Sequence, residues 1–225
     1  MAIREIKLPD GTVLKLDEWL HSSLFSTIEF AAASKLTLKA FSYTVGQTVP
    51  SQGLAKRQAN EADTNQVVRG RTNQDEAFVV YSFTYELFGL SNASANPSNL
   101  VGLAPVAAVA PQYSRHNVLA IQRSMLVELF VGANINKPQL RVPMSRINQS
   151  IGPVAHGTQF AGGAIDFGTA GRVSANNQWR LEIPVYIESD RVFNMKFSTP
   201  EALADLNQNM RLRATLDGMK RRPVA

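Results

Sequence analysis

The chain has 225 residues, a net charge of +5 and 44% hydrophobic residues, which suits one large β-domain or two small domains with a buried core. It contains no cysteine, and this excludes disulfides, a thiol nucleophile and a thiolate metal site. Charged residues make up only 18%, while 15 Asn and 12 Gln supply polarity without charge. This balance is typical of surfaces that make extensive protein–protein contacts, although ordinary compositional drift also produces it.

Neither a secretory leader nor a membrane span is expected. Residues 1–7 carry charges and have no long apolar run. The longest uncharged segment, residues 91–112, is interrupted by three prolines, which makes it a poor membrane span.

The N-terminal segment predicts a short hairpin. Pro9-Asp10-Gly11 is a turn sequence between two short strands at 3–8 and 12–16. Asp17 then suits the cap of a helix, because apolar residues follow it at four-residue spacing. From residue 26 onwards apolar and polar residues alternate, so a strand fits this region equally well.

The next segments predict a strand and a long excursion. The apolar phase of residues 35–45 changes near Ala40–Phe41, which predicts a β-bulge that keeps both sets of side chains inside. Residues 46–75 are polar and too long for a tight connection. They predict an excursion with a short helix over 54–62.

Three long strands are expected at 76–90, 117–131 and 179–187. The first carries the strongest alternation in the chain, and its core-facing residues are predicted to be Val79, Tyr81, Phe83, Tyr85 and Leu87. In the third, Pro184 lacks an amide hydrogen, which predicts an edge strand or a bulge. A turn at 188–191 should lead into a return strand at 192–197.

The C-terminal part predicts a helix, a strand and a basic tail. Thr199-Pro200-Glu201 suits the start of a short helix that reaches about Asn209. A last strand at 210–216 then precedes a tail at 217–225.

The pattern of about eight strands with long loops predicts an all-β fold. We expect an antiparallel two-sheet sandwich with short peripheral helices, and a jelly roll is the usual form for eight strands. Residues 1–225 should form one domain, with 1–34 as a hairpin or helical arm.

No catalytic residue, metal site or cofactor is predicted. The glycine-rich run at 156–174 lacks the lysine of a phosphate loop, and no G-x-S-x-G elbow is present. His21, His116 and His156 are not spaced as metal ligands. One catalytic hypothesis remains, since Glu86 and Glu128 could form a glycosidase-like carboxylate pair if their strands were neighbours.

Two groups of residues are expected to make contacts with partners. The loop at 91–112 has too many apolar residues for a solvated loop, so it should pack on a neighbouring copy or on its own sandwich. These interface residues are Leu100, Val101, Leu103, Val106 and Val109. Basic residues near the C-terminus could contact phosphates of nucleic acid or a lipid surface, although a solvated charged end is the alternative. They are Arg211, Arg213, Lys220, Arg221 and Arg222.

In its overall pattern the chain resembles a small single-jelly-roll coat (major capsid) protein of a tailless or membrane-containing bacteriophage. The resemblance lies in the long strands, the basic ends and the loop SNASANPSNLVGLAPVAAVAP. It implies a virion structural protein without enzymatic activity, made in the host cytoplasm and self-assembling into a capsid. Its partners would be copies of itself and other virion proteins, with genome or membrane lipid at the basic end and no small-molecule substrate.

Two other functions remain open. One is a carbohydrate-active sandwich, either a lectin or a glycoside hydrolase, which would need an exposed aromatic platform from Trp19 or Trp179. The other is a nucleic-acid-binding module that uses the basic end.

Overall fold

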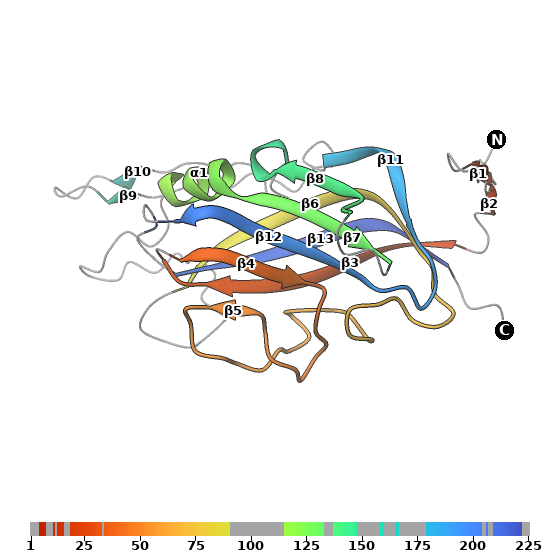
Figure 1. Cartoon of the computed structure of the whole chain (residues 1–225), viewed down its shortest axis with the longest axis horizontal. Coiled ribbons are helices and arrows are strands. Elements are labelled where there is room, and N and C mark those ends of the chain that lie inside the picture. The colour runs from red at the N-terminus through yellow and green to blue at the C-terminus, as the bar shows by residue number, and fades with distance from the viewer. Residues whose placement is uncertain are drawn as a thin grey trace.

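Two β-sheets pack face to face in the computed structural model of the chain (Figure 1). The structure describes residues 5–7, 11, 13–15, 19–32, 34–90, 115–132, 137–147, 158–159, 165–166, 179–203, 206 and 209–221. The two packed sheets confirm the prediction of an all-β, two-sheet fold.

The first sheet has five strands in the order β11-β6-β13-β3-β5. Neighbours are antiparallel except β3 and β5, which run parallel. Its strands are β3 (Trp19–Phe30), β5 (Ser51–Gln52), β6 (Phe78–Leu90), β11 (Trp179–Ile187) and β13 (Asn209–Arg221). The central strand β13 pairs with β3 on one side and with β6 on the other over nearly its whole length.

The second sheet has four antiparallel strands in the order β4-β12-β7-β8. They are β4 (Lys35–Ala40), β7 (Leu126–Val131), β8 (Leu140–Pro143) and β12 (Phe193–Ala202). Helix α1 (Arg115–Ser124) precedes β7, and the 3-10 helix η2 (Met144–Arg146) follows β8. Two small hairpins complete the elements: β1 (Glu5–Lys7) with β2 (Val13–Lys15), and β9 (Thr158–Gln159) with β10 (Ile165–Asp166).

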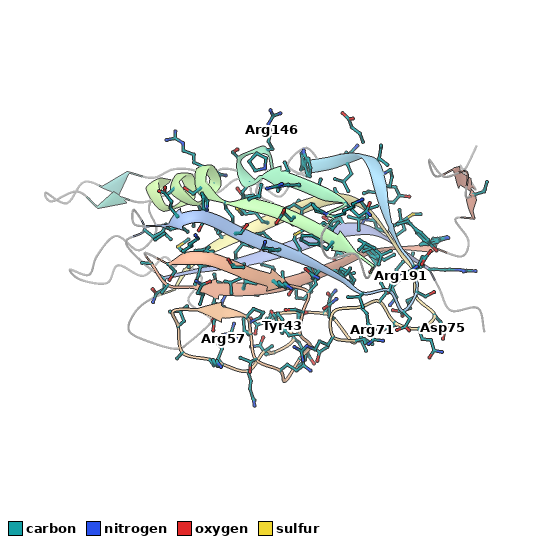
Figure 2. The ribbon with its side chains drawn as sticks, in the orientation of Figure 1. Tyr43, Arg57, Arg71, Asp75, Arg146 and Arg191 are labelled. Atoms are coloured by element: carbon teal, nitrogen blue, oxygen red, sulfur yellow. The ribbon has the colours of Figure 1, made fainter. Side chains whose placement is uncertain are left out.

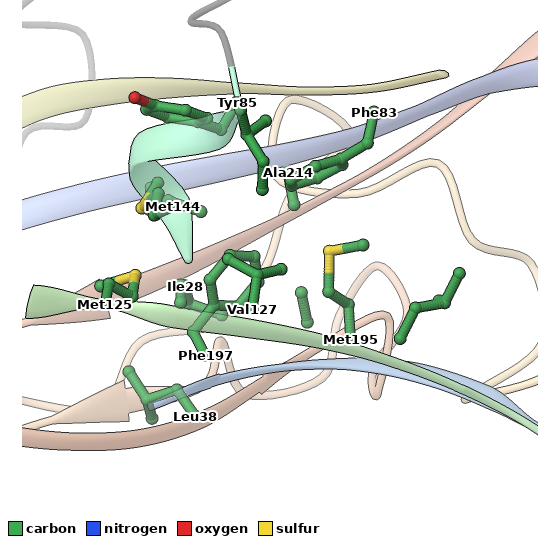
Figure 3. Packing of buried hydrophobic residues seen from close by; sticks show 14 of the residues in the cluster. Ile28, Leu38, Phe83, Tyr85, Met125, Val127, Met144, Met195, Phe197 and Ala214 are labelled. Carbon is green, nitrogen blue, oxygen red and sulfur yellow. The ribbon is translucent and has the colours of Figure 1, made fainter. Parts of the chain in front are cut away.

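One apolar core fills the space between the sheets. Successive side chains of a strand point to opposite faces, so alternate residues of the long strands enter the core where the pairing is regular. Figure 3 shows Phe83, Tyr85 and Ala214 of the first sheet opposite Val127, Met195 and Phe197 of the second. All six residues are 0% exposed, so the core is closed to water.

The strand predicted at 76–90 is confirmed as β6, but its alternation is interrupted. Phe83, Tyr85 and Leu87 enter the core as predicted. Tyr81 is an extra residue relative to β13, since Asp217 pairs with Ser82 and Gly218 already pairs with Val80. Before this bulge the core residues are therefore Phe78 and Val80, whereas Val79 and Tyr81 belong to a separate cluster with Trp19.

The predictions for the N-terminal hairpin and for Pro184 are confirmed. Gly11 in the turn has φ 89°, a left-handed conformation that glycine adopts without steric cost. Strand β11 is an edge strand, and its pairing with β6 shifts between Arg180 and Val185, the segment that contains Pro184. The turn at 188–191 leads into β12, but β12 joins the second sheet and does not pair with β11.

The long strand predicted at 117–131 is wrong in its first half, which forms α1. Ile121 and Met125 are four residues apart, a spacing that fits one face of a helix as well as one face of a strand. The N–H of Met125 donates to the carbonyl of Ile121 at 3.0 Å, and both residues are buried. Tertiary packing against β8, β12 and η2 selects the helix.

Three predicted helices are absent from the described residues. The sequence allowed a helix or a strand at 17–34, and the structure has strand β3 there. The segment 54–62 contains no helix, and residues 199–202 belong to β12. The Thr199 hydroxyl accepts a hydrogen bond from the N–H of Leu36 on β4 at 3.0 Å, so it connects two strands and does not cap a helix. Pro200 lies where the β12–β4 register shifts, a position that tolerates a missing amide hydrogen.

Two further boundaries differ from the predictions. Strand β4 ends at Ala40, and Phe41 turns with φ 60°, so both residues are buried at a chain reversal and not at a bulge within a strand. Residues 217–221, predicted as part of a tail, extend β13, and residues 222–225 lie outside the described residues.

We expect Phe83→Asp to unfold the protein. Phe83 is 0% exposed, and an unpaired buried carboxylate costs several kcal/mol against a typical stability of about 5–15 kcal/mol. Thermal unfolding followed by circular dichroism tests this, with Ile183→Asp as the control because Ile183 is 67% exposed. A folded Phe83→Asp protein with an unchanged midpoint would contradict the core assignment.

Candidate functional site

Polar and charged side chains gather on the outer face of the first sheet. On β13 the even-numbered residues Leu212, Ala214 and Leu216 lie in the core, so odd-numbered residues face outward. Two groups form there: a charge network beneath the segment 53–75, and a pocket at the β6 bulge.

The charge network joins Glu29 of β3 to Arg211, its direct cross-strand neighbour on β13. Arg211 Nη2 lies 2.5 Å from Glu29 Oε1, and Arg57 Nη2 lies 2.7 Å from the same oxygen. Arg57 also contacts Asp63 at 2.6 Å. Two carboxylates and two guanidinium groups thus balance in charge, and all four side chains are largely removed from solvent.

The network shifts the pKa values of its members. Burial alone would raise the pKa of Asp63, but hydrogen bonds from Arg57 and from the N–H of Asn60, with the charges of Arg57 and Arg211, leave it below the usual value. The hydrogen bond to Asp63 is the main reason why the pKa of Arg57 is raised. Burial raises the pKa of nearby Tyr43 to about 12. Its hydroxyl donates to the carbonyl of Thr27 at 2.7 Å and accepts from the Thr27 N–H at 3.0 Å.

The segment 53–75 also covers the free edge of β3. Asn65 Oδ1 accepts from the N–H of Phe25 at 2.9 Å, and Asn65 Nδ2 donates to the carbonyl of Ser23 at 2.7 Å. Thr64 forms a bridge with Ser26. Figure 1 shows this segment along the β3–β5 side of the sandwich, and Figure 2 places Arg57 and Tyr43 there. It therefore satisfies backbone groups that would otherwise offer an edge for pairing.

The basic residues that were predicted to contact anions lie in different surroundings. Arg211 lies in the internal network, at 9% exposure. Arg213 lies 3.3 Å from Glu86, donates to the carbonyl of Ala62 and covers the ring of Phe25. Lys220 lies 2.5 Å from Glu76.

Arg221 is exposed at the end of β13, and Arg222 lies outside the described residues. Contact with nucleic acid or lipid through this end stays a prediction. The carboxylates opposite Arg211 and Arg213 could not be identified from the sequence, because strand pairing across 182 and 127 residues brings them together.

Several other predicted site residues are outside the described part or are not brought together. The proposed interface residues Leu100, Val101, Leu103, Val106 and Val109 lie outside the described residues, as do the side chains of His116 and His156. The Glu86–Glu128 hypothesis is wrong, because β6 and β7 belong to different sheets. Both glutamates alternate with core residues, so they face outward on opposite sides of the sandwich and pair with Arg213 and with Arg141 and Lys196.

A pocket of about 310 Å³ lies at the β6 bulge on the outer face of the first sheet. The bulge turns the consecutive side chains of Tyr81 and Ser82 to the same face. Ser82 has Asp217 directly opposite on β13 and Arg180 directly opposite on β11. The pocket is lined by His21, Tyr81, Ser82, Arg180, Leu181, Asp217 and Gly218.

Gly218 allows this arrangement. A Cβ atom at this position would lie 1.8 Å from the carbonyl oxygen of Val79, so only glycine permits β13 to approach β6 this closely. Little in the sequence indicates the pocket. The prediction for 76–90 assumed unbroken alternation. The bulge at Tyr81 breaks that alternation, and only the pairing with β13 reveals it.

Two polar groups at the pocket are partly or wholly removed from solvent. Among the described residues, the Tyr81 hydroxyl is shielded from solvent and has no partner. Burial raises the pKa of Asp217, and His21 offsets this only in part. His21, Ser82 and Asp217 are the residue types of a hydrolytic triad, but no hydrogen bond within the described residues joins the imidazole to either of the others, as a triad requires.

Within the described residues, no group of three His, Asp or Glu side chains is arranged to hold a metal ion. No helix in that part of the chain is long and apolar enough to cross a membrane. Comparison of the chain with family models, curated proteins and solved structures gives no match.

We expect Glu29→Gln to lower the free energy of unfolding by about 3 kcal/mol, because it removes the carboxylate that two buried guanidinium groups contact. Urea denaturation measures the change. Glu188→Gln is the matched control: Glu188 pairs with Arg191 in an exposed turn, where the loss should stay below about 1 kcal/mol. Equal losses in the two variants would contradict a structural role for the network.

Gly218→Ala should cost about 3 kcal/mol, since β13 and β6 must separate to admit the methyl group. Gly46→Ala is the control. Gly46 has φ 83°, but a Cβ added to it would meet nothing within 4 Å, so this variant should lose only about 1 kcal/mol from backbone strain. The same urea titration decides between them, and a Gly218→Ala protein as stable as the parent would refute the close approach.

Proposed function

We propose that the chain is a self-assembling coat subunit of a virion, with a jelly-roll fold. The pairing order of its eight main strands carries this proposal. In chain order these strands are β3, β4, β6, β7, β8, β11, β12 and β13. The first pairs with the eighth, the second with the seventh, the third with the sixth and the fourth with the fifth. A single antiparallel ribbon that rolls up into two sheets produces this order.

The dimensions of the sandwich support a building-block role. Strands β3, β6 and β13 have 12, 13 and 13 residues, which corresponds to about 40 Å at roughly 3.3 Å per residue. Long paired strands around one core give a stiff body, and the connections between strands emerge at its ends and sides. Such connections can vary and make contacts while the core stays fixed.

One loop face is suited to contact with another protein. It is formed by three adjoining segments, which contain Ser42, Arg69 and Val192. The side chain of Arg69 donates to the carbonyl of Ser42, and Arg71, in the same segment as Arg69, forms a β-bridge with Val192. Figure 2 shows Arg71 and Arg191 near each other on this face. The three segments contain the exposed valines Val45, Val67 and Val192, and Val67 is 75% exposed. Exposed apolar side chains on adjoining loops suit an interaction surface.

The remaining parts of the proposal follow from the resemblance of the sequence. The subunits would form a closed, symmetric assembly through heterologous contacts between two different surfaces of the chain. The loop at 91–112 would contribute to the contacts between copies. The basic end at Arg221 and Arg222 would face genome or lipid, and the chain would reside in the virion.

Assembly is tested by size-exclusion chromatography with light scattering, followed by electron microscopy of the largest species. We expect trimers, pentamers, hexamers or larger bodies whose proportion rises with protein concentration. Val67→Asp should weaken association by about tenfold or more, because a charge replaces an apolar side chain in the contact. Because Val67 is exposed, this variant should remain folded.

Ile183→Asp, which changes an exposed residue on the β11 edge, is the matched control and should assemble as the parent does. A parent protein that stays monomeric at high concentration would contradict the coat-subunit proposal. Unchanged assembly of Val67→Asp would exclude the loop face as the contact.

A further inference from the structure

The pocket at the β6 bulge is lined by polar groups that are partly or wholly removed from solvent. Tyr81 places a shielded hydroxyl there without a hydrogen-bond partner among the described residues. Asp217 is partly buried and lines the same pocket. Ser82, between Asp217 and Arg180 in the register, is 3% exposed. Buried polar groups are normally hydrogen-bonded, and a ligand in the pocket would offer such bonds to Ser82 and Asp217.

The charges around the pocket restrict the chemistry of that partner. Asp217 opposes binding of a phosphate or carboxylate, because a like charge in a partly desolvated site is unfavourable. Arg180 opposes binding of a metal ion or an organic cation for the same reason. A neutral molecule with several hydroxyl groups meets neither repulsion, since each hydroxyl both donates and accepts hydrogen bonds.

We propose that this pocket binds a neutral saccharide unit through Asp217 and Arg180. The carboxylate of Asp217 accepts hydrogen bonds from adjacent sugar hydroxyls, and Arg180 donates to sugar oxygens from the neighbouring edge strand. Tyr81 and Leu181 line the pocket as well, and Leu181 offers an apolar surface to the C–H face of the sugar ring. A pocket of about 310 Å³ is at the lower end of the size range for small-ligand sites, which suits one or two sugar rings.

The location of the pocket supports this assignment. It lies on the outer face of the sheet, and it is built by rigid main chain: the bulge in β6, the shift in β11 and the glycine at 218. Bulges re-aim side chains, and here two consecutive side chains point into one site. The inference goes beyond the proposed function and does not depend on it, because a monomer would carry the same pocket.

Ligand-observed saturation-transfer NMR on the full chain tests the proposal. The probes are the methyl glycosides of glucose, galactose, mannose and N-acetylglucosamine at millimolar concentration, with glycine and inorganic phosphate as zwitterionic and anionic comparisons. We expect at least one glycoside to bind. Asp217→Asn and Arg180→Gln should each weaken that binding by about tenfold, because each removes charge-assisted hydrogen bonds.

Matched substitutions outside the pocket serve as controls. Asp190→Asn and Arg141→Gln replace exposed charged residues elsewhere and should leave glycoside binding unchanged. Thermal unfolding of each variant verifies that it is folded, and Arg180 is exposed, so its substitution should not disturb the sheet.

Three results would overturn the proposal. They are the absence of transfer to every glycoside, glycoside binding that Asp217→Asn and Arg180→Gln leave intact, and binding of glycine or phosphate alone. None of these bears on assembly, and a monomeric protein that binds a glycoside would overturn only the coat-subunit proposal.

Discussion

The fold depends on the pairing of β13 between β3 and β6. This strand contributes both a continuous ladder of backbone hydrogen bonds and alternate side chains to the core. It joins the last part of the chain to segments that lie far away in sequence, so the sheet closes only when the C-terminal strand is in place. Gly218 sets the distance at one end of this pairing, and Arg211 is held by Glu29 at the other. Both ends of the strand are therefore fixed by specific residues as well as by the ladder.

The charge network explains why a long polar segment stays on the sandwich. The segment 53–75 has few apolar residues to bury, and it is held instead by Arg57, Asp63 and Asn65. Buried ion pairs contribute little net stability when they are compared with apolar replacements, but they are costly to break one partner at a time. The network thus fixes the position of the segment, and with it the loop face that carries Val67.

The two proposals use different properties of the same sandwich. Assembly would use the loops of the sandwich, so contacts between copies would not involve the core residues. Saccharide binding would use an irregularity in the sheet itself, where the bulge at Tyr81 and the shift in β11 open space on the outer face. A stiff antiparallel body serves both, because it holds loops and pocket in constant positions relative to the core.

The sequence by itself determined which residues face the core where the alternation is unambiguous, as at Phe83, Tyr85 and Leu87 in β6. It also determined the roles of Gly11 and Pro184, because these follow from local stereochemistry. Spacing could not separate helix from strand at Ile121 and Met125, since both periods fit short apolar runs. Tertiary structure alone decided the strand order, the Glu29–Arg211 pair and the pocket beside Gly218. Each of these joins residues that are distant in sequence, and only the register between paired strands brings them into contact.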